Sequence, residues 1–375
     1  MTNQLHIISF NVPYPPDYGG VIDVYYKIKA LKEAGIKIHL HCYEYGREPA
    51  EQLNLLCESV NYYHREHSFR DFSSFKPYIV KTRRAKSLLK NLEDLNAPIL
   101  FEGLHTCYHL DAPSLEKRNK LVRMHNVEAD YYRGLGQSEQ NMLRRFYFYT
   151  ESVKLKFYEK ILKKANHILP ISSIDFKTLS AKYNQVTYLP AFHPNEICIS
   201  KVGRGDFILY HGNLSVSENI QAAAWLVSKV FSKINYPCII AGANPSPTIK
   251  KLIAPYPHIQ LVENPTEAKL NELLANAQIN VLPTFQQTGT KLKLLNALFR
   301  GRYVLVNKAM VEESGLDGLC IVKEKSEEMV DTIHQLMEND FTQEESERRI
   351  NILEENFSNR NNALKLVQLL DSPAP

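Results

Sequence analysis

The stretch Leu282–Val306, LPTFQQTGTKLKLLNALFRGRYVLV, decides the fold expected for this chain. An apolar strand ends at its start, a polar loop with Gly289 follows, and a helix begins near Thr290 and ends at Gly301. The strand RYVLV then begins almost at once. A strand–loop–helix–strand unit of this kind is typical of parallel sheets, in which ligands bind at the carboxyl ends of the strands. The start of the helix is therefore a predicted ligand site.

The same helix start has the chemistry of an anion site. Gly289, Thr290, Lys291 and Lys293 lie in the loop and the first turn. Backbone N–H groups there lack intrahelical partners, and the helix dipole is positive. Cations are disfavoured at this end of a helix, so two lysines indicate a bound anion such as a phosphate. Solvated lysines without a ligand are the alternative interpretation.

A related loop lies near the beginning of the chain. The strand HIISFNV leads through PYPPDYGG, which carries Gly19 and Gly20, into a helix expected over 21–34. Glycines before a helix let a phosphate or a sugar approach the backbone, although a turn that needs positive φ would also use them. Two such loops, far apart in sequence, predict an α/β protein with two doubly wound domains.

The alternation of strands and helices also predicts the domain boundaries. It continues to about residue 192, fails over 190–205, where Pro and Gly interrupt it, and restarts at DFILYHGN. In the first domain we expect a long helix around 138–165 and a last short strand, VTYLP. The predicted domains are 1–192 and 205–356.

Length and composition exclude several classes of protein. A chain of 375 residues with 44% hydrophobic and 23% charged residues can build two cores. The net charge of +4 is small, and no aromatic–basic recognition motif stands out, so no nucleic-acid partner is expected. The six cysteines lack metal-type spacing, no DxD-type acidic pair is present, and no signal peptide or spanning helix is expected. These features predict a cytoplasmic protein without a metal or other cofactor.

Polar residues and glycines follow three further predicted strands. The strands end in APILFE, KLVRMHN and DFILYHGN, and the candidates are Glu102, His105, His125, Asn126, Gly212 and Asn213. The carboxyl ends of parallel strands meet at one edge of a sheet, where a histidine or a glutamate can act as acid or base. Polar residues are common in loops, so a histidine bonded only to its own loop is the alternative.

The segment MLRRFYFYTESVKLKFYEKILKK, residues 142–164, mixes Lys and Arg with Phe and Tyr. A basic, aromatic helix of this composition can lie on an anionic membrane surface and present a lipid-linked acceptor. A helix that is half core and half solvent-exposed would have a similar composition. Peripheral contact with the cytoplasmic membrane face is therefore an expectation beside the cytoplasmic location.

In order and spacing, these segments resemble the GT-B glycosyltransferases, specifically family 4, over nearly the whole length. The segments that carry the resemblance are PPDYGGVIDVYYKIKALKEAG, MHNVEADYYRGL, LPISSIDFKTL, ILYHGNLSVSENIQAAAWL and LPTFQQTGTKLKLLNALFRGRYVL. The resemblance implies two Rossmann-like domains facing across a cleft, with a nucleotide-diphosphate sugar held mainly by the second. It also implies a final helix, about 357–372, that packs back on the first domain.

The resemblance assigns roles to residues of this chain. Taken together with the positions at strand ends, it leads us to expect His125 and Glu102 as catalytic residues, His105 on the acceptor side, and as donor-binding residues Gly19, Gly20, Asn126, Gly212, Asn213, Gly289, Thr290, Lys291, Lys293 and Asn296.

The chain also departs from the family pattern. Asn213 and Glu218 or Asn219 stand where many members have an Arg and a Lys, and Thr288 and Asn296 replace two glutamates. GTKLK matches a Gly-x-Lys-x-Lys pattern of one subgroup, so Lys291 and Lys293 are expected to supply the missing positive charge.

The expected function is transfer of a sugar from a nucleotide-diphosphate sugar to a glycan or lipid-linked acceptor, in surface polysaccharide or glycoconjugate biosynthesis. Retention of the anomeric configuration follows from the resemblance alone. Two alternatives stay open from the sequence: a nucleotide-sugar epimerase on the same fold, and a non-catalytic GT-B scaffold subunit.

Overall fold

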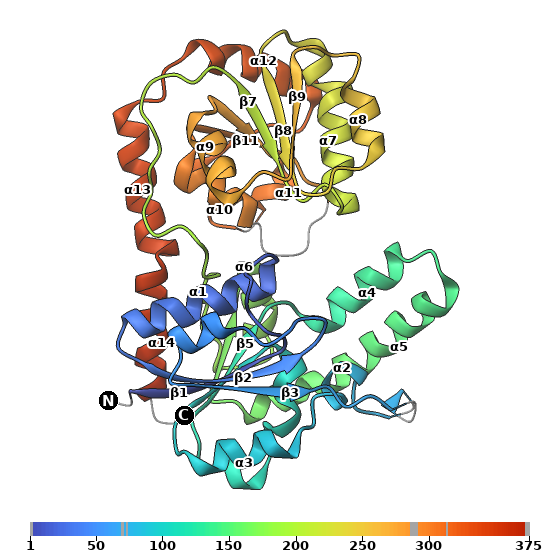
Figure 1. Ribbon diagram of the computed structural model, residues 1–375, viewed down its shortest axis with the longest axis vertical. Helices are drawn as coiled ribbons and strands as arrows, with labels where there is room; N and C mark the ends of the chain where they lie inside the picture. The colour runs from blue at the N-terminus through green and yellow to red at the C-terminus, as the bar shows by residue number, and fades with distance from the viewer. Residues whose placement is uncertain (1–2, 69–70, 73, 286–291, 313, 372–375) are drawn as a thin grey trace. The chain divides into compact units, whose positions relative to one another are not determined.

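The computed structural model describes residues 3–68, 71–72, 74–285, 292–312 and 314–371. The chain forms two compact units (Figure 1). Unit 1 comprises Met1–Pro194 and Phe357–Pro375, and unit 2 comprises Asn195–Asn356. Each unit has its own parallel sheet with helices packed against it.

Among its described residues, unit 1 has a six-stranded sheet in the order β3-β2-β1-β4-β5-β6. Every neighbouring pair of strands is parallel. The strands are β1 (Gln4–Ser9), β2 (Lys37–Glu44), β3 (Ser59–His64), β4 (Ile99–Glu102), β5 (Lys120–Met124) and β6 (His167–Pro170). The chain direction of the winding reverses between β1 and β4, which makes their carboxyl ends the expected ligand position of a doubly wound sheet.

The helices of unit 1 cover this sheet and its edges. They are α1 (Gly19–Glu33), α2 (Tyr78–Lys81), α3 (Lys86–Asp94), α4 (Glu128–Ser138), α5 (Met142–Tyr158), α6 (Ser173–Ser180) and α14 (Asn359–Asp371). The last helix, α14, packs on α1, with Leu366 and Leu370 in the same buried cluster as Val24 and Ile28. The Asn119 amide fixes its carboxyl end by donating to the carbonyls of residues 369 and 370.

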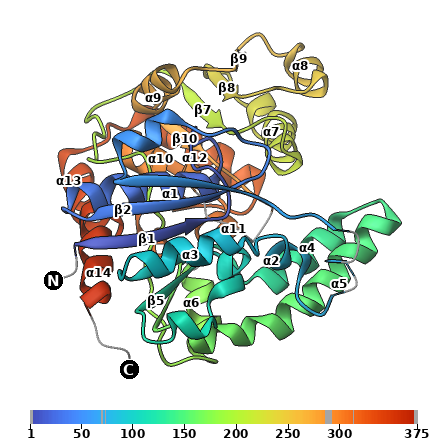
Figure 2. The same cartoon turned by 60° about the horizontal axis from the view of Figure 1, so that its bottom comes forward.

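The long helix expected around 138–165 is confirmed over most of its length, because α5 covers Met142–Tyr158 and the 3₁₀ helix η5 (Glu159–Lys164) continues it. The helix α4 before it was not expected; α4 and α5 pack on each other and project from the sheet in both views (Figures 1 and 2). Asn141 starts the second helix by accepting hydrogen bonds from two backbone N–H groups. Gly136 permits the close packing, since a Cβ there would lie 3.2 Å from the Tyr149 ring. The expected strand VTYLP does not form a regular strand, although it runs beside β6: Val186 makes an isolated bridge with Ile168, and the N–H groups of Thr187 and Leu189 donate to the Ile168 and Pro170 carbonyls.

Unit 2 repeats the topology of unit 1. Its described residues form a six-stranded sheet in the order β12-β11-β10-β7-β8-β9, again all parallel. The strands are β7 (Ile208–His211), β8 (Cys238–Gly242), β9 (Ile259–Glu263), β10 (Ile279–Val281), β11 (Tyr303–Val306) and β12 (Ile321–Val322). The helices are α7 (Ser217–Lys229), α8 (Pro247–Ile253), α9 (Glu267–Asn276), α10 (Leu292–Arg300), α11 (Lys308–Val311), α12 (Ser326–Glu338) and α13 (Gln343–Phe357). The predicted α/β fold with two Rossmann-like domains is confirmed.

No helix in the described part of the chain is both long enough and apolar enough to cross a membrane.

Candidate functional site

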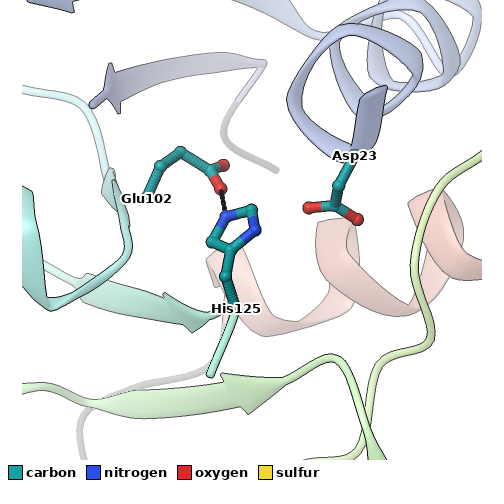
Figure 3. A group of neighbouring side chains, drawn as sticks. All are labelled: Asp23, Glu102 and His125. Atoms are coloured by element: carbon teal, nitrogen blue, oxygen red, sulfur yellow. Dashed lines mark hydrogen bonds and ion pairs between the residues drawn. The ribbon is translucent and has the colours of Figure 1, made fainter. Parts of the chain in front are cut away.

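In unit 1, the carboxyl ends of β4 and β5 bring Glu102 and His125 together (Figure 3). His125 Nε2 lies 2.9 Å from Glu102 Oε2. Glu102 is fully buried, and burial alone would favour its neutral form, but Lys27 and the hydrogen bond from His125 lower the pKa of its carboxyl. An ionised carboxylate can only accept, so Nε2 donates to it. Nδ1 has no hydrogen bond to any described residue.

A buried network of charges holds this pair in place. Lys27 Nζ, on α1, lies 2.7 Å from Asp23 Oδ2 and 2.8 Å from Glu102 Oε1. Arg123, on β5, binds Asp23 with both Nε and Nη2, at 3.1 and 2.8 Å. Burial opposes ionisation of Asp23, but the cations Arg123 and Lys27 hold its pKa well below the usual range. These five side chains form the charge network: Asp23, Lys27, Glu102, Arg123 and His125.

Asp23, Glu102 and His125 each place one potential ligand atom within 4.8 Å of the others, which is close enough for a metal ion. The site is nevertheless filled, because Lys27 Nζ contacts both carboxylates. Arg123 and the backbone N–H of Phe192 occupy the other Asp23 oxygen. A divalent cation would have to displace a lysine that already neutralises both acids, so these residues do not fit a metal.

His105 and Glu128 lie beside the charge network. His105 follows β4 in the 3₁₀ helix η3 (Leu104–His109), and Gly103, at φ +76°, leaves room for its ring. His105 Nδ1 is 3.7 Å from Glu128 Oε1, which is longer than a hydrogen bond. The Phe10 ring lies next to both imidazoles, with centroids 5.7 Å from His105 and 5.3 Å from His125. The sequence candidates Glu102, His105 and His125 therefore share one region of unit 1.

Glu128 was not a candidate from the sequence. It is 1% exposed, and no hydrogen bond of normal geometry reaches either carboxyl oxygen from the described residues. Burial raises the pKa of Glu128 to about 8 and the Asp175 carboxylate adds to the rise, while Arg83 and the nearby Asn126 side chain oppose it. Glutamates are common and stabilising in the first turn of a helix, where they are usually exposed, so the sequence gives little sign that Glu128 is buried.

Gly19 and Gly20 form the start of α1. Neither adopts a positive φ. Gly20 is instead required by packing, because a Cβ there would lie 2.7 Å from the Phe10 ring. The alternative interpretation of a turn that needs positive φ is therefore wrong, and a role of these glycines in donor binding stays a prediction.

In unit 2, the carboxyl ends of β7 and β10 meet at the reversal of strand order. Lys293, on α10, reaches across to α7, where its Nζ lies 2.9 Å from Asn219 Oδ1. The Asn219 amide in turn donates to the Asn213 carbonyl at 3.0 Å. Gly212 allows this contact, since a Cβ there would lie 3.0 Å from the Asn219 side chain. Lys293 thus places a cation at the β7–α7 loop, and residues 212–219 of this loop and helix start include no Lys or Arg of their own.

The side chains of two further candidates in unit 2, Asn213 and Asn296, are engaged in hydrogen bonds within the unit. The Asn213 side chain accepts from the backbone N–H and the hydroxyl of Ser215, so it holds its own turn. Asn296 Oδ1 accepts from Asn195 at 2.8 Å, so this amide is engaged within the unit. The predictions for Thr288, Gly289, Thr290 and Lys291 lie outside the described residues.

Comparison with known proteins found similar sequences. Residues 205–339 match the model of the glycosyl transferases group 1 family. A Klebsiella pneumoniae protein, described as an uncharacterized 44.6 kDa protein in cps region, is 26% identical over 334 residues, covering 83% of this chain and 84% of that protein.

Two solved structures resemble the whole chain in fold. S. aureus TarM, a mutant in complex with fondaparinux, alpha-GlcNAc-glycerol and UDP, has a TM-score of 0.66 at 11% identity, covering 99% of this chain and 100% of that one. Anabaena HepE in complex with UDP and glucose has a TM-score of 0.66 at 10% identity, with the same coverage. At these identities the likeness concerns the fold, while the family match concerns the sequence of unit 2. The chain therefore has the GT-B fold, and the match of residues 205–339, within its second unit, to the glycosyl transferases group 1 family supports glycosyltransferase activity.

Proposed function

We propose that this glycosyltransferase moves a sugar from a nucleotide-diphosphate sugar to a hydroxyl of a glycan or lipid-linked acceptor. The observation that carries the proposal is the Glu102–His125 pair, which leaves His125 Nδ1 without a hydrogen bond to any described residue at the carboxyl end of β5. Such a nitrogen can accept a hydrogen bond from a sugar hydroxyl and respond to charge that develops in the transition state. The UDP in the TarM and HepE complexes makes UDP-sugars the first donors to test.

In this proposal unit 2 binds the diphosphate of the donor. Lys293 brings a positive charge to the β7–α7 loop, and the first N–H groups of α7 lack intrahelical partners. A fixed cation can stabilise the leaving diphosphate as its charge grows, so we also propose that the reaction needs no metal ion. Transfer should therefore be insensitive to EDTA, and a loss of activity restored by Mg²⁺ or Mn²⁺ would contradict this part.

The binding role of Lys293 can be measured without knowing the acceptor. Lys293→Ala should weaken UDP or GDP binding roughly tenfold. One charge-assisted hydrogen bond contributes about 1.5–3 kcal/mol, and the backbone N–H groups that still bind the phosphate in the variant keep the loss near the lower end of that range. Lys233→Ala, in the same unit but paired with Glu327 at 3.0 Å, is the matched control. Equal nucleotide affinity in both variants and the wild type would remove Lys293 from the site.

We propose retention at the anomeric carbon and a role in surface polysaccharide biosynthesis. Retention rests on the family resemblance. The biosynthetic role is supported by the Klebsiella relative, which is described as a protein in cps region. Proton NMR of the first product formed would establish the anomeric configuration, and an inverted product would contradict the proposal. A protein that binds nucleotide-sugars but converts them without an acceptor would be an epimerase, and one that neither converts nor transfers them would be a scaffold.

We further propose that α5 places unit 1 on an anionic membrane. Its exposed apolar side chains recur at helical spacing, so they form one stripe about 100° wide: Met142, Leu143, Phe146, Val153 and Phe157. The buried residues Glu151 and Leu155 lie on the opposite face. Arg145 and Lys156 flank one side of the stripe and Lys154 the other, which is the charge pattern that favours anionic headgroups.

Vesicle co-sedimentation tests this surface. The wild type should bind phosphatidylglycerol-containing vesicles and bind pure phosphatidylcholine vesicles much less. The double substitution of Phe146 and Phe157 by Asp should abolish binding, because it charges two side chains that are 70% and 67% exposed. Leu55→Asp is the matched control, since Leu55 is 74% exposed elsewhere in unit 1. Equal sedimentation of the two variants would refute the membrane role of α5.

A further inference from the structure

Unit 1 contains polar atoms that are buried without partners beside the Glu102–His125 pair. Among the described residues they are the two carboxyl oxygens of Glu128, Nδ1 of His105 and Nε of Arg83. Burying a polar group without a hydrogen bond destabilises the folded state, so several such atoms in one place need a reason. A ligand that supplies the missing hydrogen bonds is a physical reason.

Two of these atoms, His105 Nδ1 and Glu128 Oε1, are placed to bind one hydroxyl group between them. His105 Nδ1 and Glu128 Oε1 are 3.7 Å apart, too far to bond directly. A hydroxyl oxygen placed about 2.8 Å from each atom would donate to one while accepting from the other, and because both atoms are buried, the two side chains must move apart to admit it. The His105 side chain is 22% exposed although its Nδ1 is buried, so rotation of this side chain is the route by which a ligand reaches the position.

The surroundings favour an uncharged sugar over an ion. Burial keeps His105 in its neutral form by lowering its pKa well below 6.5, and Glu128 has the raised pKa described above. Both partners are thus neutral near pH 7. The Arg83 guanidinium is directed elsewhere, since its Nη atoms donate to the Ile79 and Phe10 carbonyls. The half-buried Phe10 ring offers an apolar face beside the polar groups, as small-molecule sites commonly do.

We propose that Glu128 and His105 form a subsite for a hydroxyl of an uncharged sugar unit. The inference rests on the proposed sugar-transfer function and deepens it. Glu128 acts there as a binding residue, because its carboxyl contacts the sugar, and His105 completes the pair. The sugar can belong to the donor or to the acceptor, and both have the same hydroxyl chemistry.

Ligand-observed NMR titrations test the subsite with two kinds of probe. One is a panel of methyl glycosides of glucose, galactose, mannose and N-acetylglucosamine, and the other is UDP-glucose compared with UDP. Glu128→Leu and His105→Ala should each weaken binding at least tenfold for the glycoside if the acceptor sugar binds here, or for UDP-glucose if the donor sugar does. UDP binding should be unchanged in either case. Glu128→Gln keeps both hydrogen-bonding functions and should stay within about threefold of the wild type.

Glu159→Gln is the matched control, since Glu159 is also buried in unit 1 but is paired with Lys182 at 2.8 Å. The subsite is refuted if the wild type binds none of the glycosides and no more tightly to UDP-glucose than to UDP. It is equally refuted if Glu128→Leu binds every probe as the wild type does. Failure of the proposed function is distinguishable, because it would appear as UDP binding that is absent or insensitive to Lys293→Ala.

Discussion

The buried Glu128 carboxyl predicts an unusual dependence of stability on pH. A carboxyl whose pKa is raised in the folded state holds its proton there and loses it on unfolding. Below pH 4.5, its ordinary value, the group is neutral in both states and costs nothing. As pH rises toward about 8 the unfolded state ionises and the folded state does not, so stability falls across this window.

The size of the effect follows from the two pKa values. They differ by about 3.5, which corresponds to about 5 kcal/mol when the group is fully titrated, at about 1.4 kcal/mol for each pKa unit. About 4 kcal/mol of this develops between pH 5 and pH 9. Burial is the main cause of the raised pKa of Glu128; Asp175 raises it further, Arg83 and Asn126 lower it, and His105 lies opposite the carboxyl.

Glu128→Gln removes the titration and nearly preserves the shape. We expect the variant to match the wild type at pH 5 and to exceed its free energy of unfolding by about 4 kcal/mol at pH 9. Urea unfolding followed by circular dichroism at each pH measures the difference. Ala129→Gly, a non-titrating change at the next residue, should differ from the wild type by the same amount at every pH. A Gln variant whose advantage does not grow with pH would refute the reasoning.

Three further predictions concern other parts of the molecule. His125→Ala should lower kcat about 100-fold with UDP affinity unchanged, because its contact acts mainly in the transition state; a variant that loses only KM would contradict this. Asp23→Asn should lower the free energy of unfolding by about 3–5 kcal/mol, since it leaves Arg123 and Lys27 buried without a full counter-charge, and a urea midpoint near the wild-type value would argue against the charge network. Gly242→Ala should cost about 2–3 kcal/mol, because its Cβ would lie 2.0 Å from the Gly212 carbonyl, whereas Gly134→Ala, with open space around it, should be neutral or stabilising by up to about 1 kcal/mol in the same unfolding assay.

The fold could be predicted from the sequence because each parallel strand is a short apolar run between turn residues. Strands such as APILFE and DFILYHGN are buried on both faces and so read clearly. The α4–α5 hairpin was missed because its turn depends on two small details. One is the cap at Asn141, and the other is the packing of Gly136 on Tyr149, which joins residues that a local pattern cannot relate.

The candidate site was predicted in part. Glu102, His105 and His125 could be found because polar residues at the carboxyl ends of parallel strands converge. Lys27 and Asp23 were hidden within an ordinary amphipathic helix, where an acid and a lysine four residues apart usually form a surface pair. Only the three-dimensional arrangement shows that Arg123 and Glu102 meet them in the core.

The charge network also constrains how this sequence can change over time. Its acids, Asp23 and Glu102, are matched by Lys27 and Arg123, so loss of any one member strands a buried partner. Replacing one charged residue of the network alone gives an unstable protein, because its partner is left buried without a counter-charge. The network is therefore expected to be lost only when both partners of a pair are replaced. Among relatives of this chain, an apolar residue in place of Asp23 should therefore be accompanied by loss of the arginine at 123. The residues that position His125 therefore limit which single substitutions the first unit can accept.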